Sequence, residues 1–93
     1  MNPPSFVAAS RREASGNYLA VVVRSGRWRI IEGRCGIQWV LQYQARLGAP
    51  DTARWEGRHY VRTRRTAIRL WRQFSGQDGT ALATMLPERF RRR

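Results

Sequence analysis

The stretch YLAVVVRSGRWRIIE, residues 18–32, constrains the fold more than any other part of the chain. It contains two runs rich in β-branched and aromatic residues, with Ser25-Gly26 between them. Such runs around a two-residue link predict a β-hairpin in which Arg24 pairs with Arg27. Period-two alternation then places Arg24, Arg27 and Arg29 on one face of the sheet. The apolar side chains of the hairpin share the other face, where Glu32 lies at the end: Leu19, Val21, Val23, Trp28 and Ile30.

A third strand and a short fourth run are predicted after the hairpin. Residues 37–43 alternate Ile37, Trp39, Leu41 and Tyr43 with Gln38, Val40 and Gln42, which is typical of a strand. A helix over residues 37–47 is the alternative, since Gln, Leu and Ala all tolerate helices. Glycine, proline and aspartate then predict a loop over residues 46–57. The fourth run covers residues 58–62, with His59 and Val61 facing one way.

An amphipathic helix is predicted to follow the fourth run. Thr63 is a suitable N-cap, and Ser75-Gly76 should end the helix after Phe74. A period of 3.6 residues gathers the apolar side chains on one stripe: Ala67, Leu70, Trp71 and Phe74, with Ile68 at its edge. The same period places Arg65, Arg69 and Arg72 on another face. The helix therefore has a core-facing side and an arginine side.

These elements together predict an α+β protein, a three- to four-stranded antiparallel β-meander packed against one C-terminal amphipathic helix. A chain of 93 residues has room for one small domain with a modest core. We assign residues 17–87 to this domain. Residues 1–16 are interpreted as a flexible N-terminal arm, and residues 88–93 as a basic C-terminal tail.

The net charge of +12 predicts a polyanionic partner. It arises from eighteen basic and six acidic residues, and all eighteen basic residues are arginine. The absence of lysine is typical of a GC-rich genome, as in many bacteria and their phages, but codon usage does not account for the excess of basic over acidic residues. Nucleic acid is the commonest polyanion in a cell. DNA or RNA is therefore the expected partner.

The candidate nucleic-acid-binding residues are the arginines of the predicted strands and helix. Arginine hydrogen-bonds phosphate in a forked geometry, stacks on bases and pairs with guanine edges. The set comprises Arg24, Arg27, Arg29, Arg58, Arg62, Arg64, Arg65, Arg69 and Arg72. The helix should pack on the apolar face of the sheet, which separates its arginines from those on the charged face. Either the sheet or the helix is expected to contact nucleic acid.

The alternative function is a protein-interaction module, a small adaptor or inhibitor that docks on an acidic protein surface. Trp55 is its candidate anchor, because the predicted loop around it would present a large aromatic side chain. The structural alternative for Trp55 is that its side chain covers the core of the meander as a lid. Self-association through an exposed strand edge is a further option, and the sequence does not determine the oligomeric state.

Catalysis is not expected. His59 and Cys35 are the only histidine and cysteine, and the six carboxylates are scattered along the chain. A Cys35–His59 nucleophile pair is conceivable, but an ordinary structural role for both residues is the better interpretation. No metal-ligand spacing or phosphate-binding glycine loop occurs, so no metal or cofactor is predicted. No apolar run is long enough to span a membrane and no secretory signal is recognised, which predicts a cytoplasmic protein.

Overall fold

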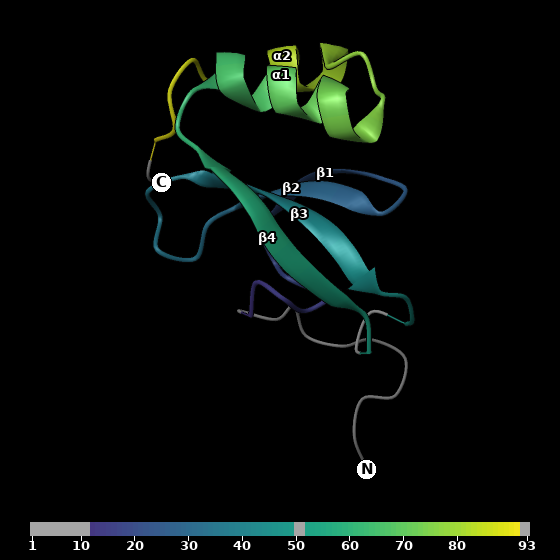
Figure 1. Cartoon of the computed structure of the whole chain (residues 1–93). Helices are drawn as coiled ribbons and strands as arrows, with labels where there is room; N and C mark the ends of the chain where they lie inside the picture. The colour runs from purple at the N-terminus through teal and green to yellow at the C-terminus, as the bar shows by residue number, and fades with distance from the viewer. Residues whose placement is uncertain (1–11, 50–51, 92–93) are drawn as a thin grey trace.

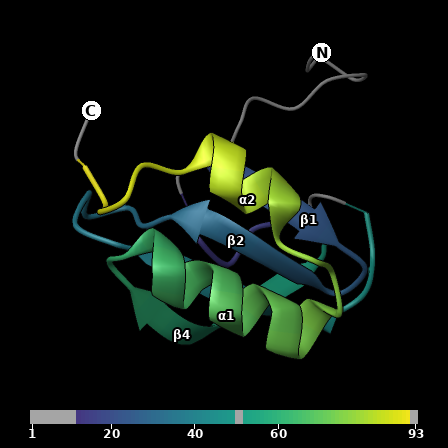
Figure 2. The same cartoon turned by 90° about the horizontal axis from the view of Figure 1, so that it is seen from above.

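The computed structural model describes residues 12–49 and 52–91. Strands β1 (Val21–Ser25), β2 (Trp28–Glu32), β3 (Trp39–Arg46) and β4 (Arg54–Val61) form an antiparallel meander in the order β1-β2-β3-β4. Helices α1 (Arg64–Ser75) and α2 (Thr80–Met85) follow and lie side by side over one face of the sheet (Figures 1 and 2). The predicted α+β meander with a covering helix is confirmed. The helical alternative for residues 37–47 is wrong, since most of this stretch belongs to β3.

The main core lies between the sheet and the two helices. The sheet contributes Ile30, Trp39, Leu41 and Val61, and the helices contribute Ala67, Leu70, Trp71 and Leu82, with Leu86 just after α2. A smaller buried cluster of Tyr18, Ile31 and Val40 lies on the opposite face. Both faces of the sheet are therefore covered in its central part.

The turn of the first hairpin differs from the prediction by one residue. Ser25 pairs with Trp28 and Arg24 with Arg29, so Gly26 and Arg27 form the turn. Gly26 has a φ of 59°, and none of the described non-glycine residues has a positive φ. Tight hairpin turns require a positive φ at their first central position, which glycine adopts without steric cost. Because Gly26 occupies the first central position of the turn, Ser25 does not need a positive φ.

An irregularity in β1 overturns the predicted positions of Leu19 and Val21. Val21 pairs with Ile31 and Val23 with Ile30, so Val22 is an extra residue in the ladder. One extra residue reverses the alternation of side chains beyond it. Val22 packs against the main core instead of Val21, and both Leu19 and Val21 are exposed.

Strand β4 begins four residues earlier than predicted. Gly57 is one of the residues that predict a loop over residues 46–57, yet it pairs with Gln42 inside the sheet. A Cβ at this position would lie 2.5 Å from the Tyr60 hydroxyl oxygen and 3.2 Å from Val40 Cγ1. Glycine within a strand often marks such a close approach. Ile37 is predicted to belong to the third strand, but it precedes β3 and is exposed.

Helix α1 agrees closely with the sequence pattern. The Thr63 hydroxyl accepts a hydrogen bond from the Thr66 N–H at 3.3 Å, and Gly76 closes the helix with a φ of 78°. Ala67, Leu70 and Trp71 are buried against the sheet, while Ile68 and Phe74 are partly buried beside them. The short helix α2 covers the part of the core that lies nearer to β1.

Residues 12–20 cross the face of the sheet opposite the helices (Figure 1). The Trp55 N–H donates to the Ala14 carbonyl at 2.9 Å, and at the other end of the segment the Glu32 N–H donates to the Ala20 carbonyl at 2.9 Å. Residues 12–16 belong to the predicted flexible arm and are bonded to the sheet in this way. The rest of that arm, residues 1–11, lies outside the described residues.

The predicted basic tail also includes residues that contact the domain. The Arg64 N–H donates to the Glu88 carbonyl at 2.8 Å, and the Phe90 N–H donates to the Arg62 carbonyl at 2.7 Å. The Phe90 ring stands edge-on to Trp39, with ring centroids 5.1 Å apart. Residues 92–93 of the tail lie outside the described residues.

Candidate nucleic-acid interface

The outer face of α1, formed by Arg65, Arg69 and Arg72, is the clearest basic surface of the molecule. At 100° per residue these three side chains project opposite Ala67, Leu70 and Trp71, which pack on the sheet. All three arginines are exposed. The helix contains no acidic residue that could pair with them. The apolar stripe thus determines which way the arginines point, namely away from the sheet.

Charge compensation on this face is slight. The side chains of Arg65 and Arg69 have no hydrogen bond or ion pair in the part of the chain that the structure describes. The Asp78 carboxylate accepts a hydrogen bond from the Thr80 N–H at 2.9 Å. This bond and the nearby positive charge of Arg72 lower the pKa of Asp78. Like charges at helical spacings of three and four residues repel one another, so the face is held together by the core rather than by its own contacts.

Arg64, the fourth arginine of α1, does not belong to the outer face. It is half-buried, and its Nη1 donates to the Leu86 carbonyl at 3.2 Å. This bond links the first turn of α1 to the end of α2. Arg64 therefore has a structural partner that Arg65 and Arg69 lack.

Arg27 and Arg58 meet at the Tyr43 ring, on the helix-covered side of the sheet. Their guanidinium carbons lie 4.9 Å and 4.8 Å from the ring centroid. Arg27 also donates to the Gln44 carbonyl, with its Nη2 at 2.6 Å, and Arg58 pairs with Glu56 at 3.3 Å. Trp28 packs on Tyr43 with ring centroids 4.8 Å apart. Both guanidinium groups are thus held by an aromatic ring and by polar partners.

Arg62 lies apart from these groups, at the end of β4. It is exposed and lines a shallow hollow together with Arg89, Phe90, Gly36 and Ile37. At this position Arg62 does not contact Tyr43, Arg27 or Arg58.

Arg29 is buried on the opposite face, where the sequence predicted a charged surface. It is 1% exposed. Its guanidinium donates to the Glu13 and Ser15 carbonyls, both at 2.8 Å, and to Gln42 Oε1 at 2.6 Å. Burial and the neighbouring charge of Arg24 lower the pKa of Arg29 to about 10, so it stays charged at neutral pH. The prediction that Arg29 lies on an exposed charged face of the sheet is therefore wrong.

Trp55 is also buried, and the prediction that it lies in a loop is wrong. It belongs to β4, pairs with Gln44 and is 2% exposed. The guanidinium carbons of Arg29 and Arg24 lie 4.2 Å and 5.0 Å from its ring centroid. Its indole N–H has no hydrogen-bond partner among the described residues. The predicted interface anchor is thus a packing residue beneath residues 12–20.

The nine predicted arginines therefore separate into groups. Arg65, Arg69 and Arg72 share one outward surface, and Arg27 and Arg58 share the Tyr43 ring. Arg24 and Arg29 lie on the far face with Trp55. Gln42 and Gln44, which accept hydrogen bonds from Arg29 and Arg24, are not among the site residues predicted from the sequence. The amide side chains at every second position of β3 were the available signal.

The described residues offer few side chains that could bind a metal or take part in catalysis. Within residues 12–49 and 52–91, no three His, Cys, Asp or Glu side chains converge as metal ligands would. Cys35 is exposed, and the His59 ring packs on Phe74 with ring centroids 5.0 Å apart. Neither described helix is long and apolar enough to cross a membrane.

The fold and the basic helix face define a small α+β protein with an arginine-bearing outer layer. Comparisons with protein-family models, curated proteins and solved structures found no match to this chain.

Proposed function

We propose that this protein binds nucleic acid without catalysis, through the outer face of α1. The observation that carries the proposal is the row of Arg65, Arg69 and Arg72 on an exposed helix face with no acidic residue in the helix. Arginines that are already paired with protein groups have less to offer a phosphate. Arg65 and Arg69 have no such partner in the described part of the chain.

The spacing of the three arginines suits a phosphate backbone or a groove. Seven residues of helix separate Arg65 from Arg72, or about 10 Å along the axis. Nucleotides of one DNA strand rise about 3.4 Å each, so the row spans about three of them. The major groove of DNA, about 12 Å wide, also admits a single helix. Phosphate binding would release counterions and offset the repulsion within the row.

The amino-acid composition bears on the origin and the cellular location of the protein. An arginine-only basic set is consistent with a small bacterial or phage protein, and a nucleic-acid partner is consistent with the cytoplasm. A second candidate function, docking on an acidic protein partner, is favoured by a different surface, the edge of β1.

The test is fluorescence anisotropy with labelled double-stranded DNA, single-stranded DNA and RNA at several salt concentrations. The test variant carries Arg65→Gln, Arg69→Gln and Arg72→Gln. The matched control carries Arg34→Gln, Arg46→Gln and Arg54→Gln, which removes the same charge from exposed positions outside α1. We expect the α1 variant to bind at least about tenfold more weakly and to show a flatter salt dependence.

Two results would contradict the proposal. Equal losses in the two variants would mean that total charge, and not the α1 face, attracts the polyanion. Failure of the wild-type protein to bind any of the three nucleic acids at moderate salt would remove nucleic acid as the partner.

A further inference from the structure

Strand β1 is one edge of the sheet. It pairs with β2 on one side, and no other described strand lies beside it. The free side of an edge strand presents unpaired N–H and C=O groups that another extended chain can join. Proteins commonly protect such an edge with charge, and Arg24 is the only charged residue of β1.

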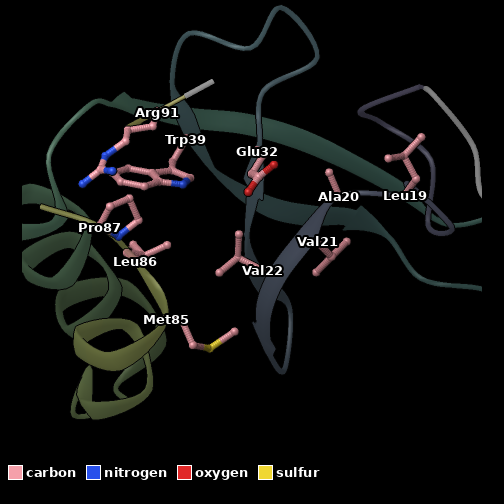
Figure 3. A pocket seen from close by; sticks show the side chains of 10 residues that line it. All are labelled: Leu19, Ala20, Val21, Val22, Glu32, Trp39, Met85, Leu86, Pro87 and Arg91. Carbon is pink, nitrogen blue, oxygen red and sulfur yellow. The ribbon is translucent and has the colours of Figure 1, made fainter. Parts of the chain in front are cut away.

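A hollow beside β1 collects exposed apolar side chains (Figure 3). Leu19, Val21 and Met85 line it and are 55%, 39% and 53% exposed. Val22, Trp39 and Leu86 line its inner part. The bulge at Val22 is the local cause, because it turns Val21 outward. Of the six large apolar side chains exposed within residues 12–49 and 52–91, three therefore gather at this one place.

The hollow continues along the strand. A second hollow is lined by Val23, Arg24 and Ser25 together with Gln77, Asp78 and Gly79 from the connection between the helices. Residues 19–25 are thus flanked by accessible space over their whole length. The five residues of β1 extend over about 17 Å, which suits an extended peptide better than a compact small molecule.

The charges around this groove favour an acidic occupant. Arg91 lines the first hollow, and Arg34 lines a neighbouring hollow that shares Leu19 and Glu32 with it. The carboxylates present are Glu32 and Asp78, and Asp78 is already engaged by the Thr80 N–H and the charge of Arg72. The protein as a whole carries +12, so a second copy would be repelled and an acidic segment attracted.

We propose that the groove along β1, residues 19–25, binds an extended segment of a partner protein by strand addition. The segment alternates apolar with acidic side chains. Its main chain pairs with the free edge of β1, and its apolar side chains, which share one face of the added strand, contact Val22 and Met85 on the helix side of the sheet. This inference is independent of nucleic-acid binding, because α1 presents its arginines on a different surface.

The test uses a labelled, end-capped peptide of about eight residues that alternates valine with glutamate, and a second peptide that alternates valine with lysine. Two further valine–glutamate peptides carry N-methyl groups, either on every valine or on every glutamate. Alternate residues of an added strand donate to the edge, so one methylated peptide should lose binding and the other should keep it. We expect the glutamate peptide to bind at least about tenfold more tightly than the lysine peptide.

Protein variants locate the site. Leu19→Glu places a charge in the groove, while Leu47→Glu makes the same change at a residue that is 63% exposed and lies outside the groove. We expect Leu19→Glu to weaken peptide binding by about tenfold or more, and Leu47→Glu by less than about twofold. A variant with only Arg65 and Arg69 changed to Gln, which leaves Arg72 beside Asp78 in place, should retain the peptide and separates this test from that of the nucleic-acid proposal.

Four outcomes would overturn the inference. These are failure of the glutamate peptide to bind, equal binding of the glutamate and lysine peptides, equal binding of the two methylated peptides, and equal effects of Leu19→Glu and Leu47→Glu. A wild-type dimer in sedimentation that Leu19→Glu dissociates would assign the groove to a second copy and would also overturn it. Circular dichroism verifies that both variants are folded.

Discussion

Arg29 is the residue whose role differs most from what its position in the sequence indicates. It alternates with apolar residues in β2, so the pattern places its side chain on the face away from the helices, and the structure agrees. That face is covered by residues 12–20, whose carbonyl groups accept hydrogen bonds from the guanidinium. A buried charge is tolerated only with such partners. Arg29 therefore fastens residues 12–20 to the sheet.

We expect Arg29→Met to lower the free energy of unfolding by about 3 kcal/mol, because each buried acceptor left without a donor costs about 1 to 3 kcal/mol. Urea denaturation measures the change. Arg27→Met is the control, since the Arg27 side chain is only half-buried whereas Arg29 is 1% exposed. It should cost less than about 1.5 kcal/mol. Similar losses in both variants would mean that Arg29 does not fasten the segment.

Trp55 is a second residue whose burial could not be predicted from the local sequence. Trp55 is followed by Glu56 and Gly57, which is typical of a loop, but Gly57 lies in the sheet, where a Cβ would meet Tyr60 and Val40. The nearest of these contacts is to Tyr60 in β4 itself, and the other is to Val40 in β3, which is distant in sequence. A local pattern could not distinguish this glycine from one in a turn.

At the scale of elements, α1 was predicted most accurately. Its capping residue, its apolar stripe and its closing glycine are all local features, and each has the conformation that its residue type favours. The strands were predicted from the sequence, but the register in which they pair was not. A bulge at Val22 and further irregularities between β3 and β4 shift the side-chain alternation, and these depend on the partner strand.

The two glycines at the ends of the α1–α2 connection provide a matched test of this element. Gly76 and Gly79 have φ values of 78° and 82°, so alanine is strained at both. We expect Gly76→Ala to cost about 1 to 2 kcal/mol of unfolding free energy, because no atom lies within 4 Å of the added Cβ. Gly79→Ala should cost more, because its Cβ would lie 2.8 Å from Cγ2 of Ile68, a stiff β-branched side chain.

Urea denaturation of the two glycine variants measures this difference directly. Backbone strain is nearly the same at both sites, so the excess loss at Gly79 reports the packing of the α1–α2 connection on Ile68. Equal losses would mean that this connection moves away from Ile68 at little cost.

For the whole molecule, the net charge of +12 is the dominant physical property. Self-repulsion of this kind lowers stability at low ionic strength and is screened within about 10 Å at 0.1 M salt. The outer face of α1 concentrates three of these charges without acidic residues in the helix. The repulsion among these arginines is consistent with the proposed anionic ligand, because a bound anion would offset it.

We therefore expect wild-type stability in urea denaturation to rise between about 0.01 M and about 0.3 M sodium chloride, as screening increases. The variant with Arg65, Arg69 and Arg72 changed to Gln should be more stable than wild type at low salt by about 0.5 to 1 kcal/mol, because two like-charged pairs are removed. The gap should narrow at high salt. A variant that is less stable than wild type would show that these arginines stabilise the fold through contacts.

The sequence by itself determined the α+β class, the hairpin near Gly26, the limits of α1 and the division of that helix into a core side and an arginine side. These follow from side-chain periodicity and capping, which act within a few residues. Only the tertiary structure decided that Arg29 and Trp55 are buried, that β4 passes through Gly57 and that Leu19 and Val21 face outward. Each of these depends on a segment distant in sequence or on the pairing of neighbouring strands. Burial and register are properties of such contacts and not of the local chain.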